Sequence, residues 1–100
     1  MYPAIFLDRD GTIIEDRGYL RRPDEVVFLD CAAPALRRLQ QDFRLFIVTN
    51  QSGISRGLQR LEEVEKINRF IEHRLAENGI HIIRTYTCRH QRIDDCPCIK

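Results

Sequence analysis

Long apolar runs are missing from this sequence of 100 residues, and so is an excess of charge of one sign. No apolar stretch approaches the roughly 20 residues that a membrane-spanning helix needs, which argues against a transmembrane protein. The chain has sixteen Lys and Arg residues and fifteen Asp and Glu residues, which gives a net charge of +1. A protein with so small a net charge has no overall basic field to attract nucleic acid. Because a basic leader with a cleavage site is also missing, we expect a cytoplasmic protein that binds neither membranes nor nucleic acids.

Internal repeats, low-complexity tracts and linker-like segments are absent from the sequence as well. The 100 residues leave no room for two self-sufficient cores, so we expect residues 1–100 to form one domain or part of one. Hydrophobic residues make up 43% of the chain, which argues against intrinsic disorder. The composition therefore indicates a small globular fold.

Short apolar runs alternate with amphipathic segments along the chain. The runs predict buried strands over 4–7, 44–48 and 81–87, with a minor extended piece at 26–29. Helices are expected over about 31–41 and 59–78; in the second, apolar residues recur every three or four positions and Asn78-Gly79 is a stop signal. Strands that alternate with helices predict an α/β fold, with helices flanking a parallel sheet.

Two carboxylates follow the first predicted strand, in the sequence Asp8-Arg9-Asp10-Gly11. Ligands of open parallel sheets bind beyond the carboxyl ends of the strands, where Thr49 is also expected. Two carboxylates this close repel each other unless a cation or a shared proton intervenes, so Asp8 and Asp10 are candidate Mg²⁺ ligands and a candidate pair of nucleophile and acid/base. For the short motif by itself, an ordinary turn is an equally good explanation.

Longer motifs resemble those of a known superfamily. Residues 6–14 (FLDRDGTII) closely resemble the first motif of the haloacid dehalogenase (HAD) superfamily of phosphohydrolases, and residues 48–54 (VTNQSGI) resemble its second. The segments 16–20 (DRGYL) and 50–57 (NQSGISRG), with the late cysteine cluster, are similar to the branch that contains heptose bisphosphate and histidinol phosphatases. The resemblance covers almost the whole chain and implies a HAD-like, Rossmann-like fold.

The resemblance implies a Mg²⁺-dependent phosphatase with catalytic residues Asp8, Asp10, Thr49 and Lys100. Asp8 would attack phosphorus to form an aspartyl-phosphate, while Asp10 would protonate the leaving oxygen and later activate water. Mg²⁺, held by Asp8 and the backbone carbonyl of Asp10, would offset the repulsion between the nucleophile and an anionic substrate. Thr49 and Lys100 would hold phosphoryl oxygens.

The substrate that the resemblance implies is a small phosphorylated metabolite. The surroundings of Gly18-Tyr19 and of 52–54 favour a heptose 1,7-bisphosphate, and histidinol phosphate is the alternative. A solvated surface arginine is an equally good explanation of Arg56. The residues expected to bind the substrate are Asp16, Arg17, Gly18, Tyr19, Asn50, Gln51, Ser52 and Arg56.

Three of the four cysteines fall within eleven residues near the end of the chain, with a histidine among them. Cys88, His90, Cys96 and Cys98 have the residue types and spacing of a closed tetrahedral zinc site, and cysteines two apart do not readily bridge each other. We therefore expect a zinc-binding loop over 88–98 with a structural Zn²⁺, in a reducing compartment. Cys31 is expected to be a buried or half-buried thiol on the first helix.

The acidic fourth motif of the superfamily is missing from these 100 residues. We therefore expect a C-terminally truncated fold with weaker Mg²⁺ binding and low turnover. A non-catalytic, zinc-stapled fragment that binds phosphate is accordingly an alternative from another functional class. The strand that carries this motif in the superfamily lies beside the first strand, so residues 4–7 are expected to form an exposed edge that favours self-association.

Overall fold

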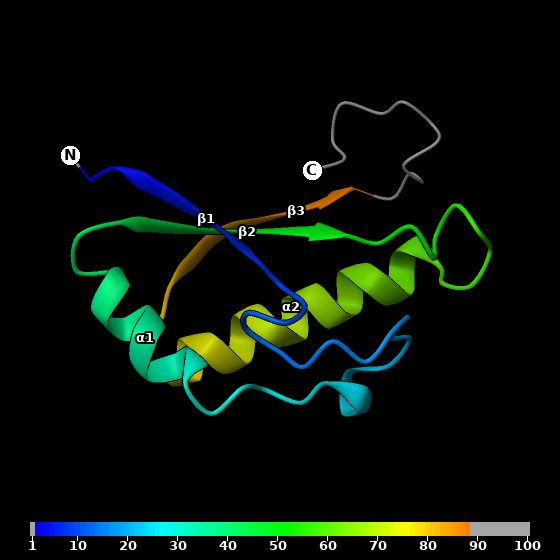
Figure 1. The fold of residues 1–100 in the computed structure, drawn as a ribbon, viewed down its shortest axis with the longest axis horizontal. Coiled ribbons are helices and arrows are strands. Elements are labelled where there is room, and N and C mark those ends of the chain that lie inside the picture. The colour runs from blue at the N-terminus through cyan, green and yellow to red at the C-terminus, as the bar shows by residue number, and fades with distance from the viewer. Residues whose placement is uncertain (1, 89–100) are drawn as a thin grey trace.

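Three parallel strands form one sheet in the computed structural model, which describes residues 2–88. The strands are β1 (Ala4–Asp8), β2 (Arg44–Asn50) and β3 (Ile82–Cys88), and they lie in the order β1-β2-β3. Helix α1 (Ala32–Leu39) precedes β2, helix α2 (Leu61–Glu77) precedes β3, and both helices lie on the same side of the sheet (Figure 1). The predicted α/β fold with a parallel sheet is confirmed.

The observed elements differ from the predicted ones mainly at their ends. Both helices are one or two residues shorter at each end than expected. Helix α2 ends at Glu77, and Asn78 caps it before Gly79, which adopts a left-handed φ of 78°. The extended piece at 26–29 follows a short 3-10 helix (Pro23–Glu25), and in it Phe28 forms an antiparallel bridge with Ile14. The expectation of a buried thiol is wrong, because Cys31 is exposed at the start of α1.

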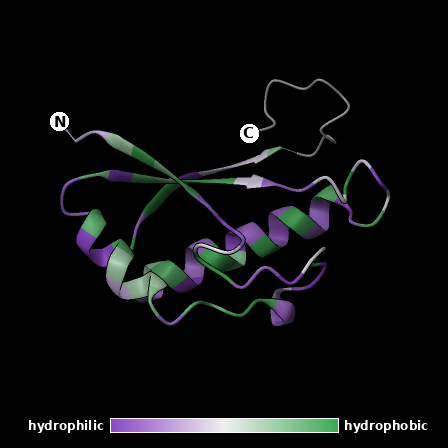
Figure 2. Ribbon diagram, in the orientation of Figure 1, coloured by the Kyte–Doolittle hydropathy of each residue, from purple (hydrophilic) through white to green (hydrophobic). Residues whose placement is uncertain are grey.

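The core lies between the helices and the sheet. Alternate residues of β2 point towards the helices, so Leu45 and Ile47 are buried. Helix α2 packs Ile67, Ile71 and Leu75, which recur at helical spacing, into the same core. Hydrophobic and hydrophilic residues accordingly alternate along the ribbon of α2 (Figure 2). Burying each of these side chains contributes about 1.5–3 kcal/mol, so the stripe on α2 fixes this helix against the sheet. Neither helix within residues 2–88 combines the length and apolarity needed to cross a bilayer.

The opposite face of the sheet carries aromatic side chains. Phe6, Phe46 and Tyr86 come from the three strands, and the rings of Phe6 and Phe46 stack with their centroids 5.0 Å apart. Phe6 is 59% exposed. Within the sheet formed by residues 2–88, β1 is an edge strand, as expected, whereas self-association through it stays a prediction.

Candidate active site

The carboxyl ends of β1 and β2 meet at one edge of the sheet. Asp8 is the last residue of β1 and pairs in register with Val48. Thr49, the next residue of β2, and Asp10, two residues after the end of β1, therefore lie near each other at this edge. A cavity of about 120 Å³ opens there, and its lining includes Asp8, Asp10, Thr49 and Asn50. The structure thus brings together the three side chains on which the phosphatase hypothesis depends.

The turn that follows β1 is built by local sequence. Gly11 adopts a left-handed φ of 83°, which a residue with a side chain rarely tolerates, and its N–H donates to the Ile14 carbonyl at 2.7 Å. Ile13 and Ile14 are fully buried, and both N–H groups donate to the Arg9 carbonyl. Burial of these two apolar side chains pulls the chain back into the core and leaves Asp10 at the cavity.

The Asp10 carboxylate accepts hydrogen bonds at both oxygens. Arg9 donates to Oδ1 from Nε (3.3 Å) and Nη2 (3.1 Å), and Oδ2 receives Gln51 Nε2 at 2.9 Å and the Thr49 hydroxyl at 3.3 Å. The side chain is 19% exposed, so it still reaches the cavity. Donors on both oxygens fix the orientation of the carboxylate. A general acid or base needs such a fixed orientation, because it must lie within hydrogen-bond reach of the atom that gains or loses the proton.

Gln51 lies behind the site rather than at its surface. The side chain is buried, and besides Asp10 its amide donates to Thr49 Oγ1 at 2.6 Å. Gln59, also buried, donates to Gln51 Oε1 at 3.2 Å and to the Leu20 carbonyl at 2.6 Å. Buried amides therefore connect the loop that ends at Leu20 to the Asp10 carboxylate.

The other residues predicted to bind substrate lie on two neighbouring loops. Asp16, Arg17, Gly18 and Tyr19 are exposed, and none of them lines the cavity at Asp8. The two loops touch, because a Cβ on Gly53 would come within 2.6 Å of Tyr19 Cδ1. On the second loop Asn50 lines the cavity, Ser52 is half-buried and Arg56 is exposed. Their binding roles stay predictions.

The predicted zinc ligands fall mostly beyond the described residues. Cys88 is buried at the end of β3 and is disulfide-bonded in the structure rather than a thiolate, whereas His90, Cys96, Cys98 and the catalytic candidate Lys100 lie outside residues 2–88. Within that range no three His, Cys, Asp or Glu side chains are grouped to hold a metal ion. The zinc loop and the role of Lys100 therefore stay predictions.

Sequence reasoning missed the groups that hold Asp10 in place. The sequence predicted no role for Arg9, yet its guanidinium is buried against the Asp10 carboxylate. Asn68 carried a signal that could have been noticed, because it is a polar residue on the apolar stripe of α2, between Val64 and Ile71. Asparagine at such a position needs a hydrogen-bond partner inside the protein.

No model of a known protein family matches the chain. It is similar, however, to curated proteins that share one activity in their names. It is 42% identical over 98 residues to "Probable D-glycero-D-manno-heptose-1,7-bisphosphate 7-phosphatase" from Thermoplasma volcanium, which covers 97% of this chain and 67% of the relative. It is 42% identical over 89 residues to D-glycero-beta-D-manno-heptose-1,7-bisphosphate 7-phosphatase from Yersinia pestis, covering 88% and 47%. The chain thus spans about half to two thirds of these relatives.

A solved structure agrees with these relatives. The crystal structure of D,D-heptose 1,7-bisphosphate phosphatase from B. bronchiseptica, complexed with magnesium and phosphate, matches with a TM-score of 0.87 at 34% identity. The match covers 98% of this chain and 56% of that one. Shared fold and sequence, with the Asp8 and Asp10 motif at the end of β1, show that the chain belongs to the D-glycero-D-manno-heptose 1,7-bisphosphate 7-phosphatase family of HAD-like phosphatases.

Proposed function

We propose that this chain hydrolyses the phosphate ester of a sugar bisphosphate, D-glycero-D-manno-heptose 1,7-bisphosphate being the best candidate, through a phosphorylated Asp8. The observation that carries the proposal is the cavity shared by Asp8, Asp10 and Thr49. Relatives named for this activity, and a similar structure solved with magnesium and phosphate, support it.

The reaction takes place in two displacements at phosphorus. In the first, a carboxylate oxygen of Asp8 attacks, the bond from phosphorus to the sugar oxygen breaks, and Asp10 gives that oxygen a proton. In the second, Asp10 takes a proton from water, which attacks phosphorus and releases inorganic phosphate from Asp8. The Asn50 N–H, at the end of β2, and the Thr49 hydroxyl, once it turns from Asp10 Oδ2 towards the substrate, hold the phosphoryl oxygens as their charge changes.

The donor atoms at the cavity suit a hard cation. Asp8 and the backbone carbonyl of Asp10 are the proposed Mg²⁺ ligands, because Mg²⁺ prefers oxygen and the Asp10 carboxylate already accepts hydrogen bonds from Arg9, Thr49 and Gln51. Bound Mg²⁺ supplies positive charge that lowers the repulsion between an ionised nucleophile and a phosphate.

The loop that follows β3 belongs to the same proposal. Cys88, His90, Cys96 and Cys98 are proposed to hold a structural Zn²⁺, and Lys100 to reach the phosphoryl group. The basis is the ligand spacing and the resemblance of this segment to the zinc loop of related phosphatases. Thiolate ligands also favour a reducing compartment, which is why we propose a cytoplasmic enzyme.

The test is phosphate release by the purified chain with Mg²⁺, offered heptose 1,7-bisphosphate and histidinol phosphate in parallel. We expect faster release from the heptose ester, and in Asp8→Asn a loss of at least about 1000-fold, because the nucleophile is removed. Acid-quenched wild-type protein should carry one phosphoryl group by mass spectrometry, and Asp8→Asn none.

Two results would replace this proposal with another. Preference for histidinol phosphate would reassign the substrate while keeping the mechanism. Equal, negligible release from wild type and Asp8→Asn, with inorganic phosphate still bound, would leave a non-catalytic phosphate-binding fragment.

A further inference from the structure

A buried arginine lies directly behind the Asp10 carboxylate. Arg9 is 1% exposed, and its Nε and Nη2 both donate to Asp10 Oδ1. The remaining terminal nitrogen, Nη1, donates to Asn68 Oδ1 at 2.9 Å. Removing a guanidinium from water is costly unless its donors find acceptors, so the direction of this side chain is set by Asp10 and Asn68 together.

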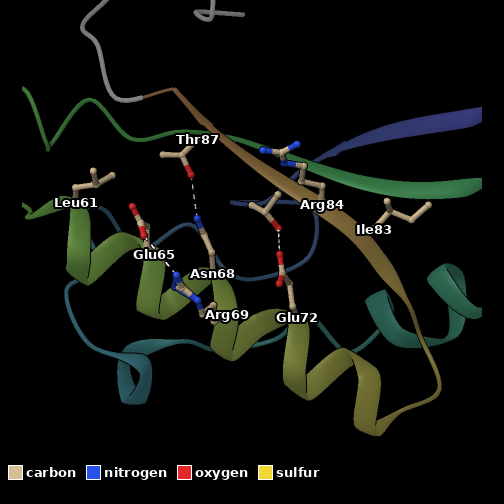
Figure 3. Close-up of a pocket in the computed structure, with 9 residues that line it drawn as sticks. Leu61, Glu65, Asn68, Arg69, Glu72, Ile83, Arg84 and Thr87 are labelled. Carbon is tan, nitrogen blue, oxygen red and sulfur yellow. Dashed lines mark hydrogen bonds and ion pairs between the residues drawn. The ribbon is translucent and has the colours of Figure 1, made fainter.

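Asn68 is itself held at both ends of its amide. It lies on the buried stripe of α2 and is 7% exposed, and its Nδ2 donates to the Thr87 hydroxyl on β3 at 3.0 Å (Figure 3). Arginine can only donate, so Oδ1 must face Arg9 and the amide cannot turn over without losing that bond. A continuous set of hydrogen bonds thus runs from Thr87 through Asn68 and Arg9 to Asp10.

We infer that Arg9 and Asn68 are positioning residues that aim the Asp10 carboxylate at the reacting phosphate ester, an inference that rests on the proposed function. Arg9 contacts Asp10 from the side opposite to Thr49 and Gln51, which donate to the other oxygen. Without Asn68 the guanidinium keeps its two bonds to Asp10 but loses the bond that anchors it to α2, so it holds the carboxylate less firmly in one direction. A displacement of about 1 Å at such a group costs on the order of 100-fold in rate.

A second hydrogen bond between α2 and β3 provides a matched control. Thr85 donates to Glu72 Oε2 at 2.5 Å, one helical turn along α2 from Asn68. Both bonds cross the same groove of about 650 Å³ between the helix and the strand (Figure 3). Neither Thr85 nor Glu72 lines the cavity at Asp8, so this link tethers helix to strand without reaching Asp10.

The experiment compares Asn68→Leu and Thr87→Val with Thr85→Val in the full chain. Each variant removes a hydrogen bond between α2 and β3 while nearly preserving side-chain size. We expect Asn68→Leu to lower kcat about 10- to 100-fold with KM changed by less than about twofold, Thr87→Val to lower it less, and Thr85→Val to leave it unchanged. Equal loss of kcat in Asn68→Leu and Thr85→Val would overturn the inference, since a purely structural tether predicts that result.

A second measurement is independent of turnover. Hydrogen exchange at the Arg9 Nε–H, followed by NMR, should be several-fold faster in Asn68→Leu and unchanged in Thr85→Val, because only the former removes a hydrogen bond that anchors the guanidinium. Unchanged exchange in Asn68→Leu would overturn the inference. If wild type releases no phosphate from any ester, the proposed function fails, and the exchange measurement decides the positioning role by itself. If Asn68→Leu does not fold, the same comparison is made with Thr87→Val, which keeps the Arg9 contact but frees the amide.

Discussion

Substitutions of Gln59 should separate the hydrogen bonds of this buried amide from its packing. The side chain is 4% exposed, and Nε2 donates to the Leu20 carbonyl and to Gln51 Oε1. Its own Oε1 has no hydrogen-bond partner in the part of the chain that the structure describes. Gln59 therefore gives two hydrogen bonds and receives none, an asymmetry that makes the effect of each substitution calculable.

Gln59→Leu removes both donations and nearly preserves the size of the side chain. Each buried acceptor left without a donor costs about 1–3 kcal/mol, while loss of the unpaired Oε1 returns a similar amount. Two acceptors lost against one oxygen recovered leave a net destabilisation of about 1–3 kcal/mol. Gln59→Glu should cost more, about 3–5 kcal/mol at pH 7, because an ionised carboxylate cannot donate and is buried beside two acceptors.

Urea unfolding of wild type and both variants measures these differences. Burial raises the pKa of the introduced carboxyl above its unfolded value, and a protonated carboxyl can donate to the Leu20 carbonyl. The Gln59→Glu protein should therefore be most stable relative to wild type below the unfolded pKa, and lose that stability as the pH rises through the folded one. A Gln59→Leu protein as stable as wild type, or a Gln59→Glu protein no less stable than it at pH 7, would refute the reasoning.

Three further predictions concern other parts of the chain. The hydrogen bond from Arg21 lowers the pKa of Glu63. The stability that Glu63 adds should therefore be present above its unfolded pKa and be lost as the pH falls through its folded pKa. In urea unfolding across the acid range, the free energy of unfolding should decline less with falling pH for Glu63→Gln than for wild type. Metal analysis should find one zinc per chain and none after Cys96→Ser with Cys98→Ser; zinc retained by the double variant would refute the ligand set. Sedimentation velocity should show concentration-dependent association that Phe6→Lys weakens, because the introduced charge lies on edge strand β1 itself, on its exposed aromatic face; a stable monomer at high concentration would contradict the idea.

Much of the fold was predictable because its signals are local. The apolar runs at 4–7 and 44–48 became β1 and β2, since a strand buried on a sheet needs only a short continuous stretch of apolar residues. The stop of α2 at Asn78-Gly79 likewise depends on the freedom of one glycine to adopt a positive φ. Cys31 was misjudged because burial depends on which side of α1 faces the sheet, and the start of a short helix carries little information about that.

The candidate site divides in the same way. Asp8, Asp10 and Thr49 were predictable as neighbours, because each ends or follows a strand and parallel strands end at a common edge. Gln51 lies buried beside Asp10, a position that its place in the sequence did not reveal, because the turn after β2 directs it inward; its predicted role at the substrate stays a prediction. Sequence distance hides such contacts: Arg9 and Asn68 are separated by 59 positions.

The sequence by itself determined the type of each element, the polar turns that end the strands and the identity of the candidate catalytic side chains. These follow from interactions between residues only a few positions apart. The tertiary structure decided which donors hold Asp10, because the partners of Arg9, Gln51 and Gln59 depend on how α2 and the loops pack against the sheet. A buried hydrogen bond forms when packing brings its two atoms within about 3 Å, and no periodicity along the chain encodes that distance.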